Sequence, residues 1–140
     1  MLCLLLGICI GALQSGCMGA CDILDHDTKE LSGDYCLGYT SEFNEYVVES
    51  CGRRSHLGIF DGSVSRLGWT DRYIVAWRVA RIATIAAGGV QPAVKAGWMV
   101  LDVREKTIDG PLSEPAFADL KARRPALADV VIHEVSEMLP

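Results

Sequence analysis

Charge is absent from the beginning of this 140-residue chain, because its first 21 residues contain no Asp, Glu, Lys or Arg. The apolar run inside that segment, residues 2–13, is only 12 residues long. A membrane-spanning helix needs about 20 apolar residues, so the run is too short to cross a bilayer. It has the length of the hydrophobic region of a signal peptide. We therefore expect residues 1–20 to be an export signal, and a buried N-terminal helix is the alternative.

The usual catalytic and cofactor motifs are also missing. No serine lies in a Gly-x-Ser-x-Gly elbow, and the pair Gly88-Gly89 is not followed by the Lys-Ser/Thr of a phosphate loop. The net charge is −5, which argues against nucleic acid as the main partner. No internal repeat indicates a solenoid or a propeller. These absences predict a protein that is not an enzyme and that uses no cofactor or metal.

One string comes near a catalytic motif. Residues 133–137 read His-Glu-Val-Ser-Glu, whereas a zinc protease helix needs a second histidine where Glu137 stands. The other histidines are His26, in an acidic linker, and His56, in an arginine-rich turn. We interpret His133 and Glu134 as an exposed helix face. A small envelope hydrolase or metal enzyme that uses these two residues is the alternative.

Two cysteines follow the apolar run, each after small residues. Gly16 precedes Cys17, and Gly19-Ala20 precedes Cys21. This arrangement resembles the lipobox of bacterial lipoproteins, in which cleavage leaves an acylated cysteine at the new N-terminus. The resemblance implies that residues 1–20 are a signal peptide of the lipoprotein type and that one of these two cysteines carries lipid, whereas an ordinary cleaved signal peptide is the alternative. Residues 21–33, which are polar and without periodicity, are then expected to be a tether to a single domain over residues 34–140.

Cys36 and Cys51 are the cysteines that remain in the expected domain. Alternating residues predict strands over 35–40 and 45–51, joined by a hairpin loop at 41–44. In that hairpin Cys36 lies opposite about Glu49, one diagonal step from Cys51, and a small register shift or bulge would let the two cysteines bond. Such a bridge suits an exported protein and could add about 3 kcal/mol to stability. Two buried free thiols are the alternative.

Short β-type runs continue to residue 108. Asp61-Gly62 predicts a hairpin turn between strands at 57–60 and 64–69. Thr70-Asp71 predicts the next turn, before a strand at 73–77 whose outward face carries Arg72 and Arg78. A further strand is expected at 98–103, with a short return at 107–108. Residues 79–87 fit either an extension of the preceding strand or a short alanine-rich helix, and Gly88-Gly89 with Pro92 predicts a flexible connection to the next strand.

The C-terminal part is expected to be helical. Asp109-Gly110-Pro111 predicts the end of the sheet, and Ser113 has the character of an N-cap for a helix to about Ala122. Apolar spacing from Leu127 to Met138 favours a second helix, with a final strand at 130–132 as the alternative. The fold class is therefore α+β and mainly β. We expect an antiparallel meander of five to six strands with one or two C-terminal helices.

Three stretches are similar to a group of small uncharacterised bacterial lipoproteins with a domain of unknown function. They are Leu31-Ser32-Gly33-Asp34-Tyr35, the run from Gly68 to Ala76, and the run from Trp98 to Phe117 with its Asp109-Gly110-Pro111-Leu112-Ser113 core. The resemblance covers about residues 31–122. It implies a lipid-anchored envelope protein and assigns no catalytic residue.

Together these patterns predict a protein of the bacterial cell envelope, facing the periplasm or the exterior. An N-terminal acyl anchor would hold it to a membrane. Its role is expected to be binding of another protein or of an envelope component, and one specific version is an inhibitor or immunity protein against a secreted toxin or hydrolase. An exposed, flat or concave aromatic patch on the sheet would favour a binding role.

Overall fold

The computed structural model describes residues 28–40, 45–53, 58–86 and 89–139. Over these ranges the protein is mainly β, with antiparallel sheets and an α-helix near the C-terminus, as the sequence predicts. The elements are β1 (Lys29–Glu30), β2 (Tyr35–Thr40), β3 (Glu45–Ser50), β4 (Val64–Trp69), β5 (Tyr73–Arg78), β6 (Thr84–Ala86), β7 (Gly89–Gln91), β8 (Gly97–Asp102), β9 (Thr107–Leu112), α2 (Glu114–Arg123) and β10 (His133–Glu134), with 3-10 helices η2 (Pro125–Asp129) and η3 (Val135–Glu137).

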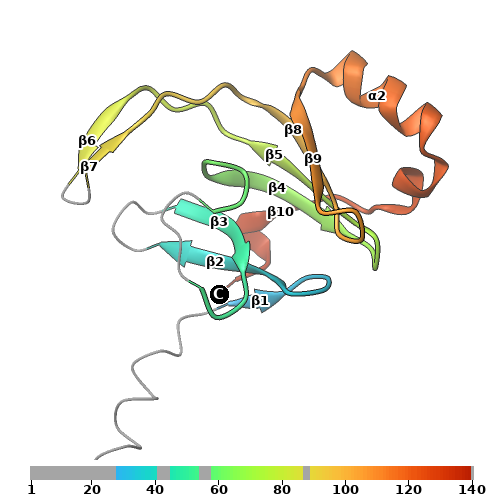
Figure 1. Ribbon diagram of the computed structural model, residues 1–140, viewed down its shortest axis with the longest axis horizontal. Helices are drawn as coiled ribbons and strands as arrows, with labels where there is room; N and C mark the ends of the chain where they lie inside the picture. The colour runs from blue at the N-terminus through green and yellow to red at the C-terminus, as the bar shows by residue number, and fades with distance from the viewer. Residues whose placement is uncertain (1–27, 41–44, 54–57, 87–88, 140) are drawn as a thin grey trace, which may run out of the picture.

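The elements form three layers (Figure 1). The middle layer is a five-stranded sheet in the order β10-β4-β5-β8-β9, and a separate sheet in the order β1-β2-β3 packs on one of its faces. The opposite face is covered by α2 and η2. The longer strands are thus divided between two sheets, and β3 and β4 belong to different ones.

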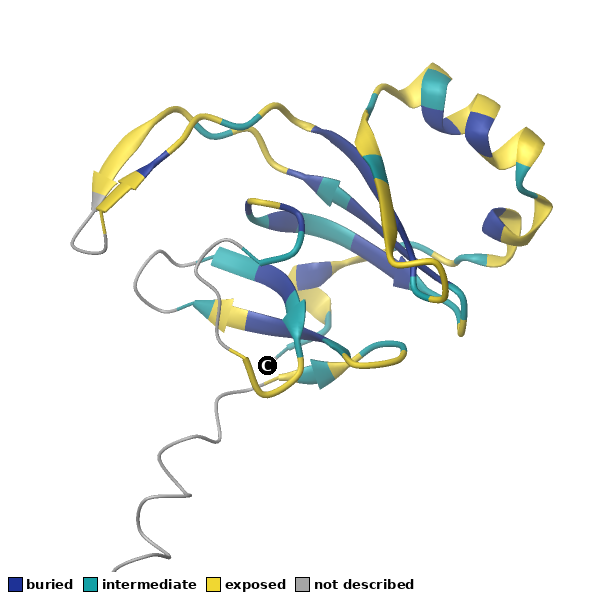
Figure 2. Ribbon diagram, in the orientation of Figure 1, coloured by how far each residue is buried: buried dark blue, intermediate teal, exposed yellow. Residues whose placement is uncertain are grey.

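The central strands β5 and β8 are buried on both faces (Figure 2). Ile74 and Met99 pack toward the three-stranded sheet, whereas Val75 and Val100 pack toward α2. The expectation that one face of β5 is outward was therefore wrong for Arg78, which is only 7% exposed. A sandwiched strand alternates between two apolar layers, so the alternation of side chains did not mark a solvent face.

Two expected boundaries in the first half were also wrong. Residues 29–30, placed in the tether, form β1, and Lys29 pairs with Leu37. Residues 58–61 form a turn instead of a strand, although Asp61 does adopt the positive φ expected of it, at 56°. Phe60 lies in this turn and is 1% exposed, so its aromatic ring contributes to the core from a loop.

The β8–β9 hairpin runs further than expected. Asp109-Gly110-Pro111 does not end the sheet, because β9 continues to Leu112 with an irregular register opposite residues 98–100. The helix that follows is as expected: Ser113 is its N-cap, and the Ser113 side chain accepts a hydrogen bond from the Ala116 N–H at 3.4 Å. Because α2 follows β9 directly, the hairpin brings the helix onto the sheet.

The second C-terminal helix does not form. The 3-10 helix η2 is followed by an extended segment, the two-residue strand β10 and the 3-10 helix η3. The residues 130–132, all β-branched, favour extended backbone, and β4 offers an unpaired edge with which β10 pairs. The extended segment crosses β4 at Gly68, where an added Cβ would collide with the carbonyl oxygen of Val131.

Residues 79–96 extend the β5–β8 hairpin outward. Arg81 and Val94 form an isolated antiparallel bridge, and beyond it β6 pairs with β7, with Thr84 opposite Gln91. We call residues 79–96 the arm. Figure 1 shows that it projects away from the layers, on the side opposite α2. Of the two possibilities for residues 79–87, the strand extension is correct over the described residues. The flexible connection expected from Gly88-Gly89 to Pro92 was wrong at Gly89–Gln91, which forms β7.

Candidate functional site

The residues proposed from the sequence for chemistry are not gathered into a site. His133 and Glu134 are both exposed on β10, opposite Leu67 and Arg66, and they do not lie on a helix face. Within the described residues, no group of three or more His, Cys, Asp or Glu side chains is placed to hold a metal ion. His26 and His56 lie outside the described residues, and so do Cys17 and Cys21.

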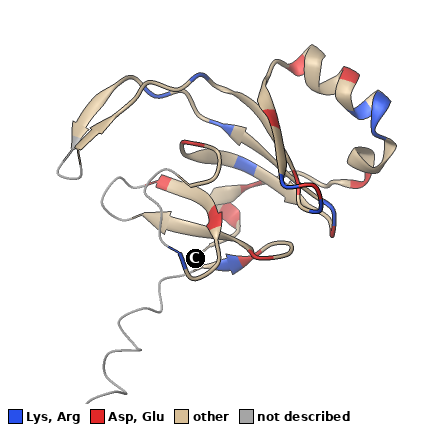
Figure 3. Ribbon diagram, viewed as in Figure 1, with Lys and Arg blue, Asp and Glu red and all other residues tan. Residues whose placement is uncertain are grey.

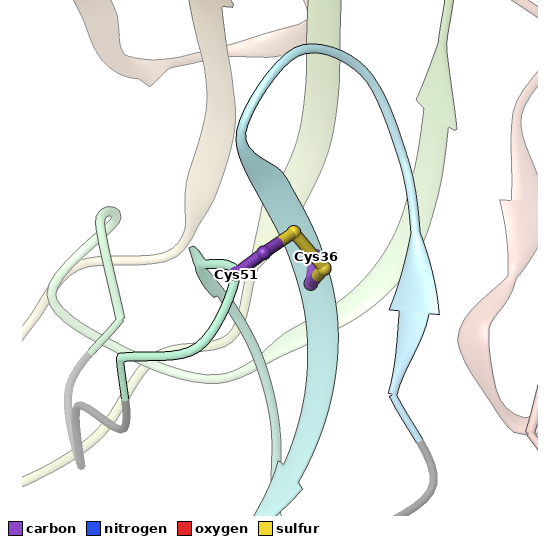
Figure 4. The surroundings of a disulfide bond; sticks show 2 residues. All are labelled: Cys36 and Cys51. Atoms are coloured by element: carbon purple, nitrogen blue, oxygen red, sulfur yellow. A yellow bond between two sulfur atoms is a disulfide. The ribbon is translucent and has the colours of Figure 1, made fainter.

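The predicted disulfide is present and joins β2 to the turn after β3 (Figure 4). Cys36 pairs with Glu49 across the ladder, as expected, and bonds to Cys51 at an S–S distance of 2.00 Å. Cys36 is buried and Cys51 is exposed. The bond links the start of β2 to the turn after β3, at the end of the hairpin opposite residues 41–44. Its role is therefore to stabilise the β2–β3 pair.

An aromatic cluster lies under α2. The Trp98 ring stacks on Phe117 at 4.7 Å between centroids and meets the edge of Trp77 at 5.4 Å. The guanidinium of Arg66 lies 4.9 Å from both indole centroids. Trp98 and Phe117 are buried and Trp77 is half-buried against them, so the cluster is part of the core. The cluster secures the helix to the sheet.

An acidic residue organises the β8–β9 turn. The Asp102 carboxylate accepts hydrogen bonds from the backbone N–H groups of Arg104 and Glu105, at 3.0 and 3.1 Å, and from the Arg72 side chain at 3.2 Å. Burial by itself would raise the pKa of Asp102, but these bonds and the charge of Arg72 hold the pKa below its usual value. The partnership in turn raises the pKa of Arg72. This group stabilises a turn and leaves no oxygen positioned for a substrate.

The arm is the one feature of the described surface that the fold does not explain. Three of its side chains are the most exposed large hydrophobic residues of the described chain: Ile82 is 80% exposed, Ile85 87% and Val90 73%. Ile85 and Val90 are directly opposite each other on β6 and β7 and therefore share a face. Of the residues in β7, Gln91 alone is buried. Scattered exposed apolar residues are ordinary, whereas three on one projecting ribbon indicate a contact surface.

Charge reinforces this pattern (Figure 3). The 13 residues from 82 to 94 carry no charged side chain, and the arm as a whole contains Arg81 and Lys95 but no Asp or Glu. The chain has a net charge of −5, so the rest of it carries −7. The arm is therefore an apolar tip with a cationic base on an otherwise acidic protein.

Two arginines hold the base of the arm. Arg78 donates to the backbone carbonyl of Phe60 at 2.9 Å and to that of Lys95 at 3.0 Å. Arg81 donates to the Pro92 carbonyl at 3.2 Å, and its Nη1 lies 4.0 Å from the Glu45 carboxylate. Both arginines thus connect the arm to its own return strand or to a neighbouring segment. The base is anchored while the tip makes no contact with the core clusters.

Sequence patterns left the arm undecided. Ala, Gly and Thr dominate residues 83–89, and their mixture favours neither helix nor strand. The absence of charge between Arg81 and Lys95 was a usable signal, because a solvated loop of this length normally carries polar or charged residues.

Within the described ranges, none of the helices has the length and apolar character needed to span a bilayer. No protein-family model, curated protein or solved structure matches this chain. The resemblance to small bacterial lipoproteins, with the lipid anchor that it implies, therefore stays a prediction.

Proposed function

We propose that this chain is an exported bacterial protein, anchored to the cell envelope by lipid on Cys17 or Cys21, which works as a non-catalytic interaction module. The observation that carries the binding role is the arm, whose exposed tip is apolar and whose base is fixed by Arg78 and Arg81. A rigidly held apolar projection serves contact, because exposing such side chains to water brings the fold no stability.

The disulfide supports the proposed location. A structural bridge between Cys36 and Cys51 persists in oxidising compartments, such as the periplasm and the cell exterior, and is rare in reducing ones. The N-terminal apolar run of 12 residues, followed by cysteines after small residues, supports export and acylation. Acyl chains at the N-terminus would hold the domain near a membrane, with the arm available as its contact surface.

The anchor is tested by the intact mass of the full chain recovered from the membrane fraction of a bacterial host, measured with and without reductant. We expect a chain that starts at Cys17 or Cys21, carries three acyl chains and gains two hydrogens on reduction. An unprocessed chain in the cytosol would contradict the proposed location.

The binding role is tested in the same cells with a photoreactive amino acid at position 85. The matched control is position 131, because Val131 is also exposed, at 65%, but lies far along the chain from the arm. We expect a discrete adduct from position 85 and none from position 131. Equal labelling at the two positions, or no adduct at either, would contradict a contact role for the arm.

A further inference from the structure

We propose that the partner of the arm is the surface of a lipid bilayer, into which the side chains of Ile85 and Val90, which share one face of the ribbon, insert. This inference rests on the proposed function, since it names the partner of the same surface. The first support is composition: the tip offers large apolar side chains and small residues over 13 positions without one charge. Charged side chains are what the apolar part of a bilayer excludes most strongly.

The second support is the sign of the charge at the base. Lys95 is exposed where the arm leaves the sheet, at the level that lipid phosphates would occupy if the tip were inserted. Flanking cations of this kind gain favourable interactions with anionic headgroups. Because the remainder of the chain carries −7, an anionic surface would repel the body and attract the arm, which favours an approach with the arm first.

The backbone sets the depth of insertion. β6 and β7 pair only with each other, so each has an outer edge of N–H and C=O groups without a sheet partner. Such groups are costly in hydrocarbon, and open sheet edges do not lie there. The peptide groups therefore stay at headgroup level, and the side chains reach about 5–10 Å into the boundary with the acyl chains, as interfacial segments do.

A second copy of this chain fits the same surface less well. β6 and β7 have three residues each, and a pair of such ribbons would bury less than the roughly 1,000 Å² of a stable interface. The other exposed large hydrophobic residues outside the arm, Tyr39, Ile108 and Val131, lie on three different elements. The described surface thus offers no second apolar patch that would receive the tip.

The test places a tryptophan at the tip of the full chain, as Ile85→Trp, and compares it with Val131→Trp and with the parent protein. Each is reconstituted into vesicles of phosphatidylethanolamine and phosphatidylglycerol, with and without brominated acyl chains. We expect the added emission of Ile85→Trp to shift to the blue and to lose intensity with brominated lipid. The added emission of Val131→Trp should do neither.

A second pair of variants tests whether Val90 and Lys95 contribute to insertion. Val90→Asp, introduced beside Ile85→Trp, should abolish the blue shift and the quenching, and Lys95→Gln should weaken both in anionic vesicles more than in neutral ones. Since Val90 and Lys95 are exposed, these variants should fold like the parent, which thermal unfolding checks.

Each alternative has its own result. A blue shift without bromolipid quenching that grows with protein concentration would identify a second copy as the partner and overturn the proposal. If the emission maximum of the tryptophan in Ile85→Trp is the same with vesicles as in water, the proposal is overturned as well. The anchor is read separately from the intact mass, so an acylated chain with an uninserted arm and an unacylated chain with an inserted arm are distinguishable.

Discussion

Replacing Arg78 with methionine should cost the protein a large share of its stability. Arg78 is 7% exposed and donates two hydrogen bonds, to the carbonyls of Phe60 and Lys95, at 2.9 and 3.0 Å. A hydrogen bond to a charged group contributes about 1.5–3 kcal/mol, and the variant also leaves a buried carbonyl without its partner. The variant also avoids the cost of burying a charged guanidinium, which offsets part of this loss. We therefore expect the free energy of unfolding to fall by about 3 kcal/mol.

Urea-induced unfolding of the full chain in mild detergent measures this loss. The control is Arg104→Met, since Arg104 and its partner Asp71 are 63% and 84% exposed and their ion pair should contribute under about 0.5 kcal/mol. Hydrogen exchange should also rise at the Val79 N–H, which bonds to the Ser63 carbonyl beside the arm's base. If Arg78→Met unfolds within about 0.5 kcal/mol of the parent, the bonds to the two carbonyls do not secure the arm.

Three further predictions concern the scaffold. Cys51→Ala should lower the free energy of unfolding by about 3 kcal/mol, and reduction of the parent should have the same effect in urea titrations; a loss under about 1 kcal/mol would contradict a constraint on the 15-residue loop. Gly68→Ala should cost about 2 kcal/mol or more by urea unfolding, because the added methyl meets the Val131 carbonyl oxygen; unchanged stability would contradict the close crossing. The pKa of Asp102 is held low, so its contribution is present above about pH 3.9 and is lost as the pH falls through the folded value. Asp102→Asn should therefore destabilise the protein at neutral pH by about 2 kcal/mol and differ little from the parent in strong acid, and an equal difference at both pH values would contradict this sign.

Local signals in the sequence were enough for several elements. The four-residue loop expected at 41–44 set the predicted register of the hairpin, with Cys36 opposite Glu49, and this register brings Cys36 close to Cys51. Ser113 before Glu114-Pro115 marked the start of α2 within one residue. In each case, the residues that decide the structure are close together in the chain.

Other features depend on partners that local patterns do not contain. The apolar spacing from Leu127 to Met138 suits a helix, but β4 offers an unpaired edge at Arg66 and Leu67, and pairing with that edge competes successfully. The burial of Arg78 likewise depends on a second sheet packing over β5. Neither the free edge nor the second layer can be recognised before the whole fold is assembled.

The arm contains both a part that nearby residues determine weakly and a part that distant contacts determine strongly. Its tip is weakly determined, since β6 and β7 are short and, among the described strands, pair only with each other, whereas its base is strongly determined by Arg78 and Arg81. An apolar segment without function would be expected to fold back onto the body and bury Ile82, Ile85 and Val90, which would gain about 1.5–3 kcal/mol for each side chain. Hydrogen bonds from Arg78 and Arg81 to backbone carbonyls instead keep the base extended. The free energy of burying the tip side chains is therefore gained only when another surface covers the tip. The exposure of the tip is thus a consequence of how the base is built, and this is why contact with a further surface explains the arm better than a flexible loop does.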